Sequence, residues 1–102
     1  MSLKKQFLKS RPVCKVKFTL PADAAGDAKQ ANLVGDFNEW DHTATPMRKL
    51  KNGSFTTTLD LETGREYQFR YLLDGTRWEN DWEADRYVYS TFGDCDNSVI
   101  VC

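Results

Sequence analysis

Apolar and polar residues alternate with a period of two in three segments of the chain. The segments are VCKVKFTL (13–20), SFTTTLDL (54–61) and EYQFRYLL (66–73). This period is that of a half-buried strand, because successive side chains point to opposite faces of a sheet. In the third segment the apolar face carries Tyr67, Phe69, Tyr71 and Leu73. Arg70 is therefore predicted to lie on the opposite, outward face of its strand.

Turn signals separate these segments and define shorter strands. Asn52-Gly53 and Asp74-Gly75 are hairpin dipeptides, and we expect a type I′ turn, with positive φ at both residues, at Asn52-Gly53. The second turn directs the chain to Arg77-Trp78. Leu33 and Val34 suit a further strand, PMRKLK (46–51) an edge-like segment, and NSVIVC (97–102) the last strand, whereas residues 21–30 read as a loop. Because no segment has a convincing helical period, we predict an all-β, immunoglobulin-like antiparallel β-sandwich.

The length of the chain allows one domain with one core. It has 102 residues, of which 40% are apolar and 13% aromatic. We assign residues 13–102 to a single β-sandwich domain. Residues 1–12 are predicted to be a loosely docked N-terminal tail, with a brief helical turn around Leu3, Phe7 and Leu8 as the alternative.

The charge pattern excludes several classes of partner. The formal net charge is −1, which lacks the clustered basic excess of a nucleic-acid-binding protein. Ten Lys and Arg accompany five Asp and Glu up to Lys51, and four accompany ten from Asn52 onward. We interpret this asymmetry as complementarity between interleaved strands. No apolar run could span a bilayer and no secretory signal opens the chain, so we expect a cytoplasmic protein without a membrane partner.

The residues that usually hold metals or cofactors are few. Cys14, Cys95 and Cys102 lack metal-ligand spacing, and His42 has no second histidine nearby. We expect reduced cysteines, with Cys14 and Cys102 as buried small hydrophobes, and neither a metal nor a cofactor.

The carboxylates do not form a convincing catalytic pair. A glycosidase needs two carboxylates across a sugar, one of them in a dry pocket. WENDWEAD (78–85) reads instead as a solvated acidic loop, and Asp94-x-Asp96 as a turn without the glycine and glutamate of an EF-hand. The protein is therefore predicted not to be an enzyme.

Aromatic residues near turns are the remaining candidates for function. A sugar ring has an apolar face edged by hydroxyls, so its complement is a flat, partly exposed aromatic with polar groups at the rim. Trp40 and Trp78, with the cation of Arg70 between them, could supply that set. The alternatives are that each tryptophan fills the core and that Arg70 forms a surface ion pair. Trp82 and Tyr87 are interpreted as packing groups.

The ordered motifs also carry a family resemblance. VGDFNEW, then PM, GSFTTTLDL, YQFRYLLDG, Trp78 with END and AD, and FGDCDNSVIV follow one another from about Lys15 to Cys102. Together they resemble the family-48 carbohydrate-binding module, the early-set domain of isoamylases, glycogen branching enzymes and the β subunit of AMP-activated protein kinase.

The resemblance implies a set of contacts with a glucan chain. Trp40 and Trp78 resemble the two stacking tryptophans of the kinase-type modules, Arg70 their lysine, and Phe92 their leucine. Asp94 and Asp96 stand where those modules have a threonine and an asparagine. A carboxylate accepts but does not donate a hydrogen bond unless it is protonated, so these two positions depart from the family pattern.

Two functions follow from the resemblance. The first is a non-catalytic module that binds an α-1,4-glucan, namely glycogen or a maltooligosaccharide. The second is a module that docks onto a glycogen-metabolising enzyme through the same aromatic patch, without binding glucan itself.

Overall fold

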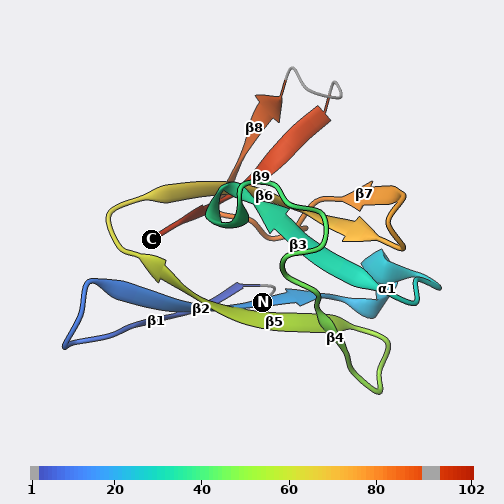
Figure 1. Cartoon of the computed structure of the whole chain (residues 1–102), viewed down its shortest axis with the longest axis horizontal. Coiled ribbons are helices and arrows are strands. Elements are labelled where there is room, and N and C mark those ends of the chain that lie inside the picture. The colour runs from blue at the N-terminus through green and yellow to red at the C-terminus, as the bar shows by residue number, and fades with distance from the viewer. Residues whose placement is uncertain (1–2, 91–94) are drawn as a thin grey trace.

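Two antiparallel sheets form the layers of the fold in the computed structural model, which describes residues 3–90 and 95–102 (Figure 1). Sheet A has the strand order β1-β2-β5-β4: β1 (Leu3–Phe7), β2 (Val13–Leu20), β5 (Phe55–Glu62) and β4 (Arg48–Lys49). Sheet B has the order β3-β6-β9-β8, with β7 paired to β6: β3 (Ala31–Gly35), β6 (Glu66–Leu73), β9 (Cys95–Val101), β8 (Arg86–Ser90) and β7 (Arg77–Glu79). The two layers confirm the predicted immunoglobulin-like β-sandwich.

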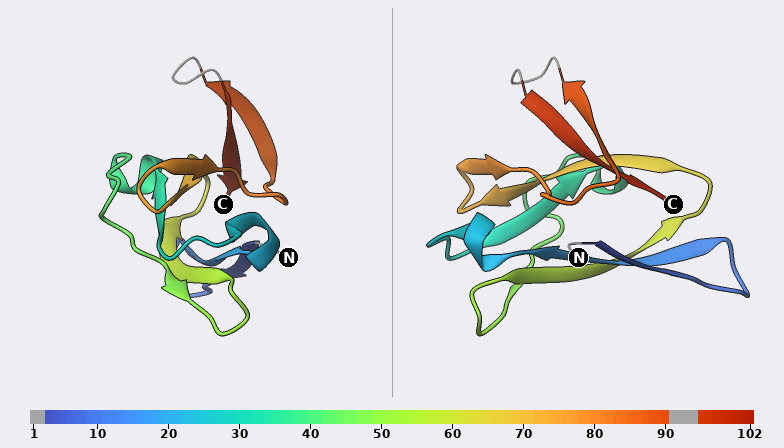
Figure 2. Two further views of the ribbon diagram at one scale, coloured as in Figure 1. Left: turned by 90° about the vertical axis from the view of Figure 1, so that its right-hand side faces the viewer. Right: turned by 180° about the vertical axis from the view of Figure 1, so that it is seen from behind.

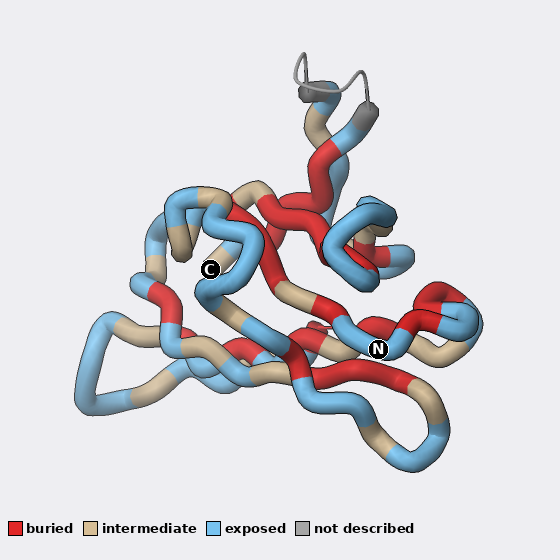
Figure 3. The backbone as a smooth tube through the Cα atoms, turned by 45° about the vertical axis from the view of Figure 1, so that its right-hand side comes forward, coloured by how far each residue is buried: buried red, intermediate tan, exposed pale blue. Residues whose placement is uncertain are grey.

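The core lies between the two sheets. The alternating apolar faces of β2, β5 and β6 point into it, and Phe18 and Phe69 meet there edge to face at 5.2 Å between ring centroids. Figure 3 shows the buried stretches running along the central strands of both layers. The faces that the alternation predicted to be apolar are therefore the ones buried in the core.

Two short helices lie in the connections. The first is α1 (Ala22–Ala25), inside the segment that was expected to be a loop. The second is a 3₁₀ helix, η1 (Asp36–Asn38), which directly follows β3. Neither is long and apolar enough to cross a membrane, as holds for every helix among the described residues.

The predicted N-terminal tail contains a strand. Leu3 to Phe7 pair with Phe18 to Cys14 along the edge of sheet A, and Leu3 is buried in the core. Leu3, Lys5 and Phe7 alternate with Lys4 and Gln6, so the period of two continues in a segment whose basic residues suggested a tail. The predicted boundary at residue 13 thus does not coincide with an edge of the observed sheet.

The two hairpin dipeptides adopt different turns. Asp74 and Gly75 have φ of 52° and 71°, as a type I′ turn requires, and Leu73 pairs with Arg77 beyond them. At Asn52-Gly53 only Gly53 has positive φ, so the expected type I′ turn is wrong. The Asn52 carboxamide oxygen instead accepts hydrogen bonds from the backbone N–H and the hydroxyl of Ser54. That interaction stabilises a longer connection between β4 and β5.

The hairpin of β8 and β9 projects beyond the sandwich (Figure 2). No strand was predicted for the residues of β8. Its Tyr87 and Tyr89 are exposed because this end of β9 has no strand of sheet A beneath it.

The charge asymmetry separates the layers more than it interleaves them. Three of the four strands of sheet A precede Asn52, and four of the five strands of sheet B follow it. One ion pair joins the layers directly, because Lys5 of β1 contacts Asp85 at 2.6 Å. The strands of the basic and acidic halves are therefore not interleaved as we expected. The basic half of the chain supplies most of sheet A, and the acidic half most of sheet B.

Candidate functional site

The stretch VGDFNEW leaves sheet B at the end of β3. Gly35 is needed there because a Cβ atom would lie 2.5 Å from the Gln68 carbonyl oxygen and 2.7 Å from the Phe69 Cβ. This close approach brings the following turn against β6. Phe37 then turns inward and packs against Phe18 and Tyr67 in the core.

The side chain of Asn38 holds the turn together. Its carboxamide oxygen accepts the Gly35 N–H at 3.0 Å, and its Nδ2 donates to the Leu33 carbonyl and to the Thr45 hydroxyl. These bonds tie both ends of the turn to one residue, so the backbone that carries Trp40 is fixed.

Trp40 stands in a conformation that large residues rarely adopt. Both Glu39 and Trp40 have φ of 58°, in the left-handed region. The Trp40 N–H donates to the Gly35 carbonyl at 2.9 Å, and its indole Nε1 donates to Asp36 Oδ1 at 2.8 Å. The other oxygen of Asp36 accepts the Gln68 N–H of β6 at 2.8 Å. The indole is thus anchored to β6 through one carboxylate.

Arg70 lies on the outward face of β6, as predicted, but it is almost buried there, with 8% of its surface exposed. Its guanidinium carbon is 5.9 Å from the centroid of the Trp78 ring, a distance typical of a cation–π contact. Trp78 comes from β7, where it pairs with Leu72, and is 39% exposed. Arg70 therefore supports one side of this indole and leaves other parts of it to solvent.

A hydrogen-bonded relay continues from Arg70 across the same face. Arg70 Nε donates to Asn97 Oδ1, and Asn97 Nδ2 donates to Gln68 Oε1 at 2.9 Å. The backbone N–H of that same Gln68 is bonded to Asp36. Trp40 and Trp78 are consequently tied to β6 at positions 68 and 70, about 7 Å apart along a strand.

The surroundings of the relay are dry. Val34 and Leu72 lie on the same outer face and are buried, although neither belongs to the core between the sheets. His42, from the turn after Trp40, packs edge to face with Trp78 at 5.2 Å. The preceding Asp41 accepts hydrogen bonds from the backbone and hydroxyl of Thr43, which lower the pKa of its carboxyl group. The ring contact of His42 with Trp78 thus brings the turn after Trp40 and the β6–β7 hairpin together on this part of sheet B.

The structure brings together only part of the set named from the sequence. Trp40, Arg70 and Trp78 are joined as described, although among the described residues the two indoles make no ring contact with each other. Asp96 is exposed and, by the alternation along β9, lies on the face opposite to Asn97. Phe92 and Asp94 lie outside the described residues.

Asn97 was missed by reasoning from the sequence. It is the side chain that connects Arg70 with Gln68, and it is 6% exposed. Alternation along β9 could have revealed it: Ile100 faces the core, so Asn97 and Val99 must share the outer face with Arg70.

The acidic segment after Trp78 is not uniformly solvated. Asp81 is 2% exposed and accepts hydrogen bonds from the Tyr71 hydroxyl at 2.6 Å and from the Glu83 N–H at 2.8 Å. The burial of Tyr71 itself, followed by the Asp81 charge, raises the pKa of Tyr71 well above its usual value. The prediction that residues 78–85 form a solvated acidic loop is therefore wrong at Asp81, which is buried and links this segment to the core strand β6.

The two aromatics that were interpreted as packing groups are also exposed. Trp82 is 55% exposed, so its assignment to packing is wrong. Tyr87 is 45% exposed, and its hydroxyl donates to the Asp81 carbonyl.

The remaining groups offer no metal site in the part of the chain that is described. No cluster of three or more His, Cys, Asp or Glu side chains occurs there. Cys14 is buried as expected and Cys102 is partly buried, and both are free thiols. Burial, followed by the neighbouring Cys14, raises the pKa of Cys102 to about 12.

Comparison with known proteins places this architecture in a family. Residues 15–92 match the family described as carbohydrate-binding module 48 (isoamylase N-terminal domain). The chain is 38% identical over 76 residues to the 1,4-alpha-glucan branching enzyme GlgB of Aquifex aeolicus, covering 72% of this chain and 12% of that protein. It is 32% identical over 82 residues to the enzyme of the same name from Photobacterium profundum, covering 79% of this chain and 11% of that protein.

The extent of these matches defines what is shared. The chain spans only about a ninth to an eighth of the length of these curated relatives. The family match, in contrast, covers most of the chain and contains Trp40, Arg70 and Trp78. The chain therefore belongs to the carbohydrate-binding module 48 family.

Proposed function

We propose that this protein is a non-catalytic module that binds α-1,4-glucan, as glycogen or maltooligosaccharide, on the outer face of sheet B. Trp40 and Trp78 are the stacking surfaces in this proposal. The curated relatives are named for action on 1,4-alpha-glucan, which gives the chemical class of the ligand.

The conformation of Trp40 is the observation that carries the proposal. A bulky residue at φ of 58° costs on the order of 1–3 kcal/mol and persists only where its surroundings impose it. Here Asp36, Gly35 and Asn38 all impose it through hydrogen bonds. A tryptophan that only filled the core would not need this arrangement, whereas a ligand platform benefits from a fixed ring.

Arg70 has a different role in this proposal from the one inferred by resemblance. Its burial and its position against Trp78 support a positioning role, in which the guanidinium orients the indole. Phe92, Asp94 and Asp96 remain proposed contacts at the rim. Cys14 and Cys102, which are free thiols among the described residues, support a reducing, cytoplasmic location as part of this proposal.

Native electrophoresis in gels that contain glycogen tests the proposal. We expect the wild-type protein to be retarded relative to a gel without glycogen. Trp40→Ala and Trp78→Ala should each weaken retardation about tenfold or more, because losing a stacked aromatic forfeits more than about 1.4 kcal/mol of binding energy.

Trp82→Ala is the matched control, since Trp82 is exposed and, among the described residues, makes no hydrogen bond or ring contact with the relay. It should leave retardation unchanged. Thermal unfolding of all three variants separates loss of binding from loss of fold. Full retardation of folded Trp40→Ala and Trp78→Ala proteins would refute the assignment.

The second candidate is docking onto a partner enzyme through the same tryptophans. The match to about an eighth of two longer enzymes favours it, because the equivalent segment there is part of a larger protein. Absence of glycogen retardation, with capture of a purified branching enzyme that Trp78→Ala abolishes, would support docking over glucan binding.

A further inference from the structure

The outer face of sheet A is rich in cations and threonines. The alternation along β1, β2, β4 and β5 places Lys4, Lys15, Lys17 and Arg48 on this face, with Thr19, Thr56 and Thr58 and with two acids, Asp60 and Glu62, at the far end of β5. It faces away from Trp78, which belongs to the other layer. The glucan proposal makes no use of any of these residues.

The cations on this face are not neutralised by neighbours. In the part of the chain that the structure describes, none of the four takes part in an ion pair. Lys4 and Lys17 stand directly opposite each other on β1 and β2, and like charges so placed are destabilising. A cross-strand pair of lysines therefore does not serve the stability of the sheet, and its charge is available to a ligand.

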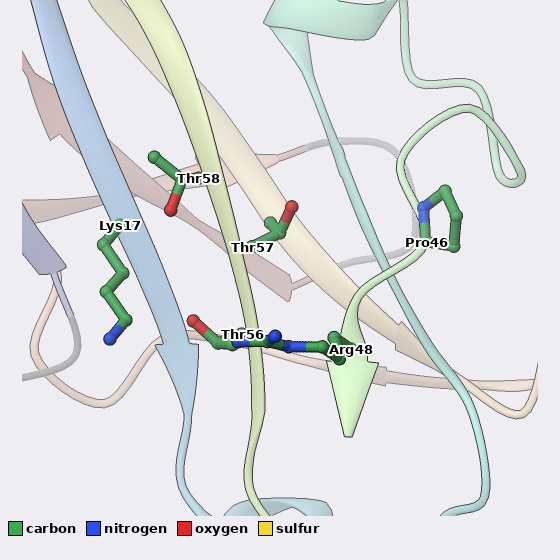
Figure 4. A pocket seen from close by; sticks show the side chains of 6 residues that line it. All are labelled: Lys17, Pro46, Arg48, Thr56, Thr57 and Thr58. Atoms are coloured by element: carbon green, nitrogen blue, oxygen red, sulfur yellow. The ribbon is translucent and has the colours of Figure 1, made fainter. Parts of the chain in front are cut away.

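A hollow of about 430 Å³ lies beside Lys17 (Figure 4). Lys17 of β2 and Arg48 of β4 flank it, and the threonines of β5 lie between them. The volume is within the range of small-ligand sites. Because β2 and β4 are separated by two strand spacings, roughly 10 Å, both long side chains can reach a group held above β5.

The hydrogen-bonding groups around the hollow are mostly donors. Lys17 and Arg48 offer only donors, and the Arg48 guanidinium can bind two oxygens of one anion. The Thr56 hydroxyl already donates to the Phe18 carbonyl, but the Thr58 hydroxyl is exposed. Pro46 closes one side with an apolar ring.

A phosphate monoester matches these donors in charge and in geometry. It carries a charge of about −1.5 to −2 at neutral pH and has three strong acceptor oxygens. A carboxylate would use fewer of the donors, and a neutral sugar would leave both cations unpaired.

We propose that Lys17 and Arg48, with the Thr58 hydroxyl, form a binding site for a dianionic phosphate group on the outer face of sheet A. Such a group has two chemical sources, free inorganic phosphate and a phosphate monoester of a sugar. This site is independent of the proposed glucan site, because the two lie on opposite layers.

Titration of the ¹⁵N-labelled full chain with inorganic phosphate at low ionic strength tests the proposal. We expect saturable shifts of the backbone amide signals of Lys17, Arg48 and Thr56 to Thr58. Lys17→Gln and Arg48→Gln should each weaken binding about tenfold or more, since each removes a charge-assisted contact. Sodium chloride at matched ionic strength should not reproduce the shifts.

Lys15→Gln is the matched control, because Lys15 shares the face but stands opposite Asp60 in the strand register and does not line the hollow. It should change phosphate binding by less than about twofold, the size of effect expected from a screened, more distant charge. Glucose 6-phosphate distinguishes the sources: tighter binding than phosphate indicates an ester on a sugar, and equal binding indicates free phosphate.

Shifts that do not saturate, that chloride reproduces, or that persist in both glutamine variants would overturn the site. Trp78→Ala provides the separation from the glucan proposal. It should leave phosphate binding unchanged whether or not glycogen is bound by the wild type.

Discussion

The outer face of sheet B holds its polar side chains in a buried relay, whereas the outer face of sheet A leaves its cations in solvent. Arg70, Asn97 and Gln68 are hydrogen-bonded in sequence under Trp78. Lys17 and Arg48 are exposed and have no ion-pair partner among the described residues. Two faces of one sandwich are thus constructed in different ways.

The difference indicates what each face can recognise. Fixed rings suit a ligand whose recognition depends on shape, because no ordering cost is incurred when it binds. Exposed cations on long side chains suit a compact anion, because they can approach its charge from more than one side. Variants that affect one face and spare the other test whether the two are separate.

Gly35→Ala should have the largest effect and should act on sheet B alone. The added Cβ would meet the Gln68 carbonyl at 2.5 Å, and neither backbone can yield without separating β3 from β6. We expect unfolding to become easier by about 1–3 kcal/mol, measured by urea denaturation. Glycogen retardation should be lost in the protein that remains folded.

Ala31→Gly is a control for this variant, because it makes the reverse exchange, alanine to glycine, in the same strand and adds no atom that could clash. It destabilises without displacing the turn, so the folded fraction should keep glycogen retardation. Normal retardation by Gly35→Ala would show that the approach of β3 to β6 does not build the site.

Arg70→Lys should weaken glucan binding while the fold persists. Lysine keeps the charge but lacks the planar fork that contacts Trp78 and the Nε that donates to Asn97. We expect roughly a tenfold loss of glycogen affinity in the gel assay, because a charge-assisted hydrogen bond contributes about 1.5–3 kcal/mol. Arg86→Lys, on exposed β8, should have no effect. If Arg70→Lys binds glycogen like the wild type, Arg70 does not position the indole.

Alkaline pH should affect both faces together, because it acts on the interior that they share. Burial holds the pKa of Tyr71 well above 10, so the folded state keeps this proton more tightly than the unfolded state. The corresponding stability is fully present below about pH 10 and is lost as the pH rises above it. The free energy of unfolding should therefore fall between pH 8 and pH 11.

Tyr71→Phe separates this contribution from those of other groups. The variant should be less stable at pH 8, where the bond to Asp81 is missing, but should lose about 1 kcal/mol less than the wild type between pH 8 and pH 11. If the free energy of unfolding falls equally in both proteins between pH 8 and pH 11, Tyr71 does not cause the loss of stability at alkaline pH.

Lys4→Glu should have the smallest effect and should act on sheet A alone. It replaces a like-charge pair opposite Lys17 by an opposite-charge pair, which favours folding by about 0.2–1 kcal/mol. Denaturation at low salt measures the gain. Lys9→Glu makes the same change of net charge outside the strands and should raise the free energy of unfolding by less. Equal gains in the two variants would show that repulsion between Lys4 and Lys17 does not destabilise the sheet.

The sequence predicted the layers well because burial follows a simple period. Phe69 and Arg70 could be assigned to opposite faces from alternation alone, and both assignments are confirmed. β1 escaped prediction because its alternation is short and three of its five residues, Lys4, Lys5 and Gln6, are polar or charged, so composition dominated the interpretation.

The site was harder to predict because it depends on contacts between distant residues. Asp36 meets Gln68, and Asn97 meets Arg70, across strands whose register no local pattern specifies. For the same reason, the burial of Asp81 beneath Tyr71 could not be seen in an acidic segment. Whether Trp40 and Trp78 contact glucan stays a prediction.

The indole N–H signals of Trp40, Trp78 and Trp82 provide the most direct test of the central claim, since the chain has three tryptophans. Titration of the ¹⁵N-labelled protein with maltoheptaose should shift the signals of Trp40 and Trp78 in a saturable manner and leave that of exposed Trp82 unchanged. Shifts of Trp82 alone, or no shift of any indole signal, would contradict glucan binding on the outer face of sheet B.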